Sequence, residues 1–437
     1  MRRDHRAVEF SASSHRSLVE CGSAATPGPG DRRVMIGTAD GRKLVAIALA
    51  LIAVATLIPE SSDAANGVVR SWHPALGDYG LADAIANVAL FVPLGWALMV
   101  AGVRPRHAVA VVLATTITVE FLQYTIVAGR QASVWDVLAN GVGGLIGMVL
   151  PHLHSRIMRS PPIALRAAAM YGVAVVAGIA VGALLQAVPQ PRALRWTNQD
   201  SHRTAFMRFE GTINDVRMNG TSVPAQAWTE IPAGHVTIDV DLASGLPSPR
   251  LAEIIQFWLP DGRGWGWVDQ RGRDLHVHAV SGSDAIRLRG HSLRVREAMP
   301  SAAGEPVALH LELQRFAHEI VVRNAQHEVR FSQRISPGDG WQLFAPFARP
   351  RERWGSLFQG LWMALLLAPL GYAAAASSLR AVAVAGAGVA IGLLLLPIAL
   401  GCAWLPVSGW CGVVCGILAG AWVGRAALRG QAPDASA

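Results

Sequence analysis

Charged residues are scarce in this chain. Asp, Glu, Lys and Arg together make up 16% of its 437 residues, whereas a typical soluble domain contains about a quarter. Hydrophobic residues make up 52%. This composition is typical of an integral membrane protein and excludes an ordinary soluble globular protein.

Cysteine is scarcer still, with four residues in the chain: Cys21, Cys402, Cys411 and Cys415. None lies between positions 190 and 350, so that long polar region needs no disulfide even if it lies outside the cytoplasm. Cys411 and Cys415 are four residues apart in an apolar segment. We expect helix packing to bury both, rather than a metal ion to bind them.

The chain has 38 Lys and Arg against 30 Asp and Glu, a formal net charge of +8. In a soluble protein such an excess would suggest binding to nucleic acid. The basic residues lie mainly in short segments beside apolar runs, where they orient membrane helices. No signature of a nucleic-acid-binding module is present. We therefore expect membrane lipids, and no nucleic acid, as partners.

Eight apolar segments approach the length of about 20 residues that a membrane helix needs. They are 43–59, 85–102, 107–127, 134–151, 164–188, 354–375, 380–401 and 407–424. The first precedes SSDAANG, which resembles a signal-peptide cleavage region. We interpret it as an uncleaved helix, because its removal would leave an odd number of spans. Met1 and Met35 are both candidate starts.

The loops richest in Arg and Lys indicate the orientation. They are 1–43, 103–107, 152–166, the turn at Arg380, and the tail with Arg425 and Arg429. With eight helices these loops all fall on one side, which the positive-inside rule assigns to the cytoplasm. Both termini are then cytoplasmic, and the polar region 190–350 lies outside.

Residues 190–350 show the alternation of β-strands. In HVTIDVDL the apolar residues recur with a period of two, and VALHLELQ repeats this pattern. Further short runs are LAEIIQFWL, DLHVHAV, AIRLRG, SLRVRE, HEIVVRN and EVRFSQR. Many short strands separated by turn residues favour an antiparallel sandwich.

The chain is therefore expected to divide into five parts. These are a disordered cytoplasmic tail (1–42), a domain of five helices (43–188), an extracytoplasmic β-sandwich (190–350), three C-terminal helices (354–424) and a cytoplasmic tail (425–437).

Seven polar residues lie near the predicted outer ends of three consecutive apolar segments. They are Asp83, Asn87, Glu120, Gln123, Arg130, Asp136 and Asn140. Such residues are costly in membrane helices and mark a functional site, unless they only hold the helices together. Functionally, they would form an outward-opening pocket in which Arg130 binds a headgroup or phosphate. Structurally, they would form an ion-pair and hydrogen-bond network that clamps three helices.

These residues lie within a longer pattern. NVALFVPLGWAL at 87–98 is followed by VEFLQYTIVAGRQASVWDVLANGVGGLIG at 119–147. Residues 43–151 thereby resemble the VanZ-like family of bacterial membrane proteins. The matching positions are Asn87, Phe91, Pro93, Leu94, Gly95, Glu120, Gln123, Gly129, Arg130, Asp136, Asn140 and Gly143. The family is named for a protein associated with resistance to the glycopeptide teicoplanin, so the resemblance implies a role in the bacterial cell envelope and its inner membrane. It implies no defined reaction.

The middle region resembles the concanavalin-like or laminin-G-like jelly roll through IIQFWLPDGRGWGWVDQRGRDLHVH. This resemblance implies a lectin-like domain that binds an envelope glycan or glycolipid. The expected fold class is a polytopic α-helical membrane protein of about eight transmembrane helices with an inserted all-β, jelly-roll-like sandwich domain.

Two groups of residues are candidates for a ligand surface on this sandwich. Trp265 and Trp267 could stack on sugar rings, although tryptophan also fills cores and lies at membrane interfaces. Four arginines alternate on two predicted strands: Arg287, Arg289, Arg294 and Arg296. They could bind lipid phosphates or an anionic glycan, or they could only keep the strands soluble.

The histidines of DLHVHAV raise the question of a metal. If the apolar residues of this run face the core, His276 and His278 both face solvent. Two histidines at this spacing without a partner Asp or Cys are a weak zinc signal. We expect solvated histidines, with no metal and no cofactor.

These observations predict a VanZ-like protein that recognises a glycan, glycolipid or lipid headgroup at the outer leaflet. An enzyme that acts on a lipid-linked envelope precursor is also conceivable, with Glu120 or Asp136 as the acid–base group. No nucleophile or metal set accompanies these carboxylates, so the sequence favours binding, and the catalytic residues stay unknown. A transporter would be expected to show interrupted helices or inverted repeats. Pro93 could interrupt the second helix, but the sequence shows no matching interruption in another part of the chain. A structural scaffold is the fourth hypothesis.

Overall fold

The computed structural model describes residues 38–57, 72–73, 79–127, 132–198, 207–232, 236–345 and 350–429. Its long helices are α1 (Thr38–Leu57), α2 (Gly80–Val100), α3 (Pro105–Thr125), α4 (Val134–Arg159), α5 (Pro161–Leu185), α7 (Pro350–Ala375), α8 (Leu379–Leu400) and α9 (Val407–Arg429). Seven of these, all except α1, are long and apolar enough to cross a membrane. The described part of the chain therefore has the helices of a multi-pass membrane protein.

The first predicted span corresponds to α1, and the count of eight spans stays a prediction. α1 begins at Thr38, so residues 38–42, expected in the disordered tail, are helical. Asp40, Arg42 and Lys43 lie in its first turns, which leaves only Leu44–Leu57 free of charge. Residues 1–37 and the SSDAANG segment lie outside the described residues.

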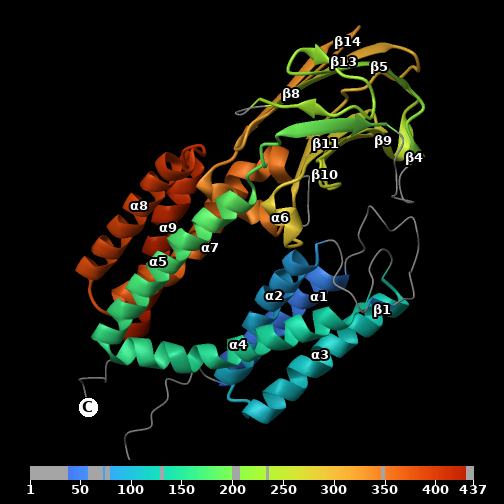
Figure 1. Cartoon of the computed structure of the whole chain (residues 1–437). Coiled ribbons are helices and arrows are strands. Elements are labelled where there is room, and N and C mark those ends of the chain that lie inside the picture. Colours follow the sequence, from blue (N-terminus) through green and yellow to red (C-terminus); the bar gives the residue numbers. More distant parts are fainter. Residues whose placement is uncertain are drawn as a thin grey trace, which may run out of the picture. The chain divides into compact units, whose positions relative to one another are not determined.

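The helices form two groups, each around its own apolar core (Figure 1). Helices α1 to α4 enclose Ile52, Phe91 and Leu94. Helices α5, α7, α8 and α9 enclose a second core that includes Leu367 and Leu393. Packing of apolar side chains within each group leaves the remaining apolar faces exposed, as lipid-facing helices require.

Glycines set the spacing of α2 and α4. A Cβ atom on Gly143 would overlap the carbonyl oxygen of Val88, and one on Gly147 would overlap that of Val92. Small residues four positions apart let two backbones approach this closely. The residue numbers rise together on both helices, so α2 and α4 run parallel, as two spans joined through one intervening helix must.

Helix α9 packs on α7 through a longer series of the same kind. Cβ atoms on Gly412, Gly416 and Gly420 would overlap carbonyl oxygens of α7. Cys411 and Cys415 lie on the other side of α9 and are exposed. The prediction that both would be buried is wrong, because the glycines, not the cysteines, form the packed face.

The region 190–335 is an all-β domain of two sheets. The longer strands are β3 (Ala193–Thr197), β5 (Thr212–Met218), β8 (Val236–Ala243), β9 (Ser248–Trp258), β10 (Gly264–Gly272), β11 (Asp274–Ala279), β12 (His291–Val295), β13 (Pro306–Leu313), β14 (Ala317–Asn324) and β15 (Glu328–Arg334). Short strands are β4 (Met207–Arg208), β6 (Thr221–Ser222) and β7 (Thr229–Glu230). The sheet orders are β12-β11-β10-β9-β3-β7 and β15-β14-β13-β8-β5-β6, and one apolar core lies between the sheets. The antiparallel sandwich is confirmed, while the jelly-roll topology stays a prediction.

All but one of the predicted runs form strands. The strand predicted for AIRLRG is wrong. Its first residue ends the short helix α6 (Gly282–Ala285), and the rest of the run forms a turn. Ser281 and Asp284 form a capping box that starts α6, and Arg287 has a φ of 59°, which no strand permits. A short 3₁₀ helix, η2 (Pro337–Leu343), then connects β15 to α7.

Candidate functional site

Buried polar side chains meet near the end of α3. Glu120 is 1% exposed, and its Oε2 accepts a hydrogen bond of 2.9 Å from the backbone N–H of Ser133. Ser133 is also the N-cap of α4, since its hydroxyl accepts from the N–H of Trp135 at 3.2 Å. Glu120 thus connects α3 to the N-terminus of α4, where backbone N–H groups lack partners within the helix.

Two amides join the same region to further helices. Gln123 donates from Nε2 to the carbonyl oxygen of Thr56 in α1 at 3.1 Å. Asn140 in α4 donates from Nδ2 to the hydroxyl of Thr116 in α3 at 2.8 Å. The three buried residues Glu120, Gln123 and Asn140 therefore link α3 to α1 on one side and to α4 on the other, and we call them the helix cluster.

The helix cluster has one unsatisfied acceptor. Oδ1 of Asn140 is buried and has no hydrogen-bond partner among the residues that the structure describes. An unpaired buried amide oxygen costs about 1–3 kcal/mol. A hydrogen-bond donor that reached this oxygen would remove that cost.

The remaining predicted members lie in different surroundings. Asp136 and Asn87 are half-buried, and Asp136 shares a face of α4 with Asn140. Arg130 lies outside the described residues. Asp83 was predicted to join the other polar residues of the helices. Instead, its Oδ1 accepts a hydrogen bond of 2.8 Å from Arg289 of the sandwich.

This contact fixes the loop after β11 against the start of α2. The Ala82 N–H donates to the carbonyl oxygen of Arg287 at 3.4 Å, and Leu288 packs against Ala82. The Arg289 guanidinium also lies 5.0 Å from the centre of the Tyr79 ring. Since Asp83 is about half exposed, the ion pair itself contributes about 0–1 kcal/mol. The ion pair matters here because it shows where the sandwich contacts the helices. The contact lies at the start of α2, which is level with the start of the parallel helix α4, near the helix cluster.

Comparison with known families addresses this helical region. Residues 44–155 match the family model VanZ/LLP1. The matched part holds every predicted polar residue from Asp83 to Asn140, and we call it the VanZ-like region. No curated protein and no solved structure matches the chain significantly. The sandwich and helices α5 to α9 lie beyond the matched residues.

The predicted ligand surface of the sandwich is not formed as expected. Trp265 is fully buried in the core, so its assignment to a surface is wrong. Trp267 is half-buried and stacks on His278 with ring centres 4.0 Å apart. The two residues are two positions apart in β10 and would share one face of a regular strand. The pairing of β10 with β9 shifts register between Gly264 and Gly266, and such an irregularity turns Trp265 to the core and leaves Trp267 on the other face.

His278 was expected to face solvent, and this expectation is wrong. It is covered by Trp267, and its Nε2 lies 3.4 Å from Oδ1 of Asp284 at the start of α6. Burial opposes ionisation of Asp284, but hydrogen bonds from His278 and Ser281 outweigh burial and lower the pKa of this carboxyl. His276 is half-buried, and burial together with nearby Arg294 lowers its pKa.

The four arginines do not form one basic stripe. Arg289 binds Asp83, and Arg294 forms an ion pair with Asp274 through Nε at 2.8 Å. Arg287 and Arg296 are exposed. The predicted stripe required strands at both AIRLRG and SLRVRE. AIRLRG forms no strand, because the capping box at Ser281 starts α6 and a turn follows it. Among the described residues no group of three or more His, Cys, Asp and Glu is placed to hold a metal ion.

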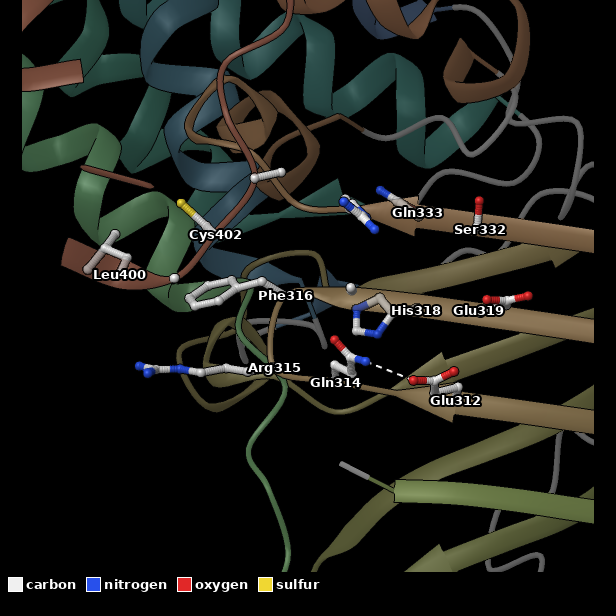
Figure 2. A pocket seen from close by; sticks show the side chains of 14 residues that line it. Glu312, Gln314, Arg315, Phe316, His318, Glu319, Ser332, Gln333, Leu400 and Cys402 are labelled. Carbon is white, nitrogen blue, oxygen red and sulfur yellow. Dashed lines mark hydrogen bonds between the residues drawn. The ribbon is translucent and has the colours of Figure 1, made fainter. Parts of the chain in front are cut away.

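A groove that the sequence does not predict lies between the sandwich and helices α7 to α9. One part, of about 740 Å³, is lined by the ends of β13, β14 and β15 and by Leu400–Ala403. A second part, of about 560 Å³, is lined by β12, η2, the start of α7 and the loop between α8 and α9. Gln333 and Arg334 line both parts, so we call the whole the junction groove. In Figure 2, Gln333 of β15, His318 of β14 and Gln314 just after β13 lie side by side, with Phe316, Leu400 and Cys402 toward the helices.

A buried hydrogen-bond network forms one wall of the junction groove. Gln359 of α7 donates to the hydroxyl of Ser336 at 3.0 Å and to Oδ1 of Asp339 at 3.2 Å. Asp339 also accepts from the N–H of Ser336 at 2.7 Å, and Gln342 continues the network to Gln333. Since η2 thereby joins the sandwich to α7, the groove has a preorganised wall. Two features of the sequence could have indicated this network. They are the Ser336–Asp339 capping box and Gln359, a glutamine within the apolar helix α7.

The buried imidazole of His318 predicts a pH dependence of stability. Burial lowers its pKa to about 4 from 6.5. The unfolded chain therefore binds a proton below pH 6.5 that the folded chain does not bind until near pH 4, so stability present above pH 6.5 is lost as the pH falls. Between pH 7.5 and 5 we expect a loss of about 2 kcal/mol from this residue.

Thermal unfolding of the full chain in detergent at both pH values measures this effect. The substitution His318→Gln should remove most of the difference, whereas His327→Gln, in the turn between β14 and β15, should keep it. An unchanged pH dependence in His318→Gln would show that the imidazole is not buried as described.

Proposed function

We propose that the protein is a multi-pass protein of the bacterial cell envelope that recognises a lipid-borne headgroup at the outer surface of the inner membrane. The helix cluster Glu120, Gln123 and Asn140 would contribute its binding site. The single observation that carries this proposal is the Asp83–Arg289 contact, which supports a placement of the sandwich and the helix cluster at the same side of the membrane.

The chemistry of the helix cluster favours a ligand that donates hydrogen bonds. Glu120 supplies a carboxylate, and Oδ1 of Asn140 is an acceptor without a partner in the described chain. Hydroxyl, amide and ammonium groups satisfy such acceptors, and all occur in envelope glycans and lipid headgroups. A sandwich beside this site would add contacts to the glycan part of the same molecule.

The proposed orientation follows the distribution of basic residues. Arg104 and Arg106 at the start of α3, and Arg156 and Arg159 at the end of α4, lie at the ends of these helices opposite to the helix cluster. Both termini would then be cytoplasmic and the sandwich periplasmic or extracellular. The match to VanZ/LLP1 extends the proposal to glycopeptide tolerance, which teicoplanin susceptibility of cells with and without the protein would measure.

The substitution Glu120→Gln tests the proposal. Glutamine keeps an oxygen that accepts from the Ser133 N–H, so the helices should stay packed, while the negative charge is lost. Because a hydrogen bond to a charged group contributes about 1.5–3 kcal/mol, we expect at least tenfold less of the specific lipid to co-purify from native membranes. Lipid mass spectrometry of the purified full-length protein measures this loss.

Thr118→Ala is the matched control, since Thr118 lies on the exposed side of α3 and its hydroxyl bonds to its own helix at Ala114. This variant should retain the lipid. If Glu120→Gln keeps the wild-type lipid profile but lowers the melting temperature, the helix cluster is a structural clamp and the binding proposal is wrong.

A further inference from the structure

Two exposed tryptophans lie at the ends of apolar helices beside the junction groove. Its second part is lined by Trp404, in the loop between the spans α8 and α9, and Trp404 is 59% exposed. Trp354 is equally exposed in the first described turns of α7. Exposed tryptophans at the ends of membrane helices are typical of the membrane–water interface.

The cations of the groove are not neutralised by its carboxylates. Arg334 lines both parts, and its side chain makes no ion pair or hydrogen bond with any residue that the structure describes. Glu319 pairs with Arg330 outside the groove at 3.3 Å, and Glu312 accepts from Gln314 at 2.7 Å. Asp339 is occupied by its network with Ser336 and Gln359. The guanidinium of Arg334 is therefore available for an anion. A planar guanidinium matches the oxygens of a phosphate group in a bidentate manner.

A buried donor in the same groove also lacks an acceptor. Trp341 of η2 is 6% exposed, lines the second part, and its Nε1 has no hydrogen-bond partner among the described residues. Its ring stacks on Phe358 of α7 at 5.5 Å, so the indole cannot turn freely. A donor held in this way requires an oxygen acceptor, and phosphate and glycerol oxygens both supply one.

We propose that the junction groove binds the phosphate-bearing headgroup of a membrane lipid, with Arg334 on the phosphate and Trp341 donating to a headgroup oxygen. The volumes of about 740 and 560 Å³ suffice for a headgroup, since ligand sites commonly measure 300–1,000 Å³. This site lies outside the VanZ-like region and uses none of the helix cluster. It therefore goes beyond the proposed function and can be tested without it.

Titration of the detergent-purified full-length protein with phosphatidylglycerol, followed by native mass spectrometry, tests the proposal. Monogalactosyldiacylglycerol, which lacks phosphate, is the matched lipid, and inorganic phosphate is the soluble competitor. We expect phosphatidylglycerol to bind about tenfold more tightly than the galactolipid, and Arg334→Gln to remove about that tenfold preference. Trp341→Phe should lower the affinity by a smaller factor.

Arg323→Gln is the control variant, because Arg323 lies on the neighbouring strand β14 and pairs with Glu328 at 2.7 Å, and neither residue lines the groove. It should bind as the wild type does. If Arg334→Gln does not fold, Arg334→Lys keeps the charge without the planar fork and should lose affinity several-fold. Equal binding of both lipids, equal effects of the Arg334 and Arg323 variants, or binding of inorganic phosphate as tight as that of the lipid would each overturn the proposal. Loss of lipid in Glu120→Gln alone would leave it standing.

Discussion

Replacing Gly420 by alanine should destabilise the protein by about 3 kcal/mol, although the change adds a single methyl group. The new Cβ atom would overlap the carbonyl oxygen of Ala368 in α7. This neighbour is backbone, so no side-chain rotation relieves the overlap, and α7 and α9 must move apart. Separation also weakens the neighbouring contacts of Gly412 and Gly416, which depend on the same close approach.

Gly388→Ala in α8 is the matched control. A Cβ atom there would meet no atom within 4 Å, so alanine should be neutral or stabilise the helix by up to about 1 kcal/mol. Thermal unfolding in detergent, followed by tryptophan fluorescence, compares the two variants. Equal melting temperatures would contradict the packing of α9 on α7.

Replacing Trp265 by alanine should cost about 3–5 kcal/mol of stability. Trp265 is fully buried between the sheets and contacts Phe257 edge to face with ring centres 6.4 Å apart. Its Nε1 also donates to the carbonyl oxygen of Pro189 at 2.8 Å, which ties the sandwich to the segment that follows α5. The substitution therefore leaves a cavity and an unpaired carbonyl oxygen.

Trp228→Ala provides the comparison, because Trp228 is about half exposed and contacts the guanidinium of Arg195. It should lower the stability by less than about 1 kcal/mol. Urea unfolding of the full chain measures both changes. If Trp265→Ala retained wild-type stability and lost only glycan binding, Trp265 would belong to a ligand surface after all.

Periodicity in the sequence was sufficient to predict most of the elements. Apolar segments gave the helices α2 to α5 and α7 to α9, and alternation gave β8 and β13 with their buried faces. AIRLRG misled because Ile286 and Leu288 alternate with arginines as in a strand. The capping box at Ser281 and the contact of Leu288 with Ala82 override that pattern.

The helix cluster could be predicted in part. Glu120, Gln123 and Asn140 are polar residues in apolar helices, and the cost of burying them indicates that they face protein. Their partners Thr56 and Ser133 carry no such signal, because the first acts through its backbone and the second lies in a short connection.

Contacts between distant segments could not be predicted. Asp83 and Arg289 are 206 residues apart, and the junction groove combines strand ends, η2, α7 and the loop between α8 and α9. Each of these segments has an ordinary local pattern. Only their three-dimensional packing places Arg334 and Trp341 in one cavity.

Sidedness is the most direct test of the central claim, that the sandwich and the helix cluster lie together at the outer membrane surface. In a chain whose native cysteines are replaced by alanine, Ser301→Cys marks the exposed surface of the sandwich and Arg106→Cys marks the start of α3. A membrane-impermeant maleimide should label Ser301→Cys in intact cells and Arg106→Cys only after lysis. The reverse labelling, or labelling of both sites from outside, would contradict the account.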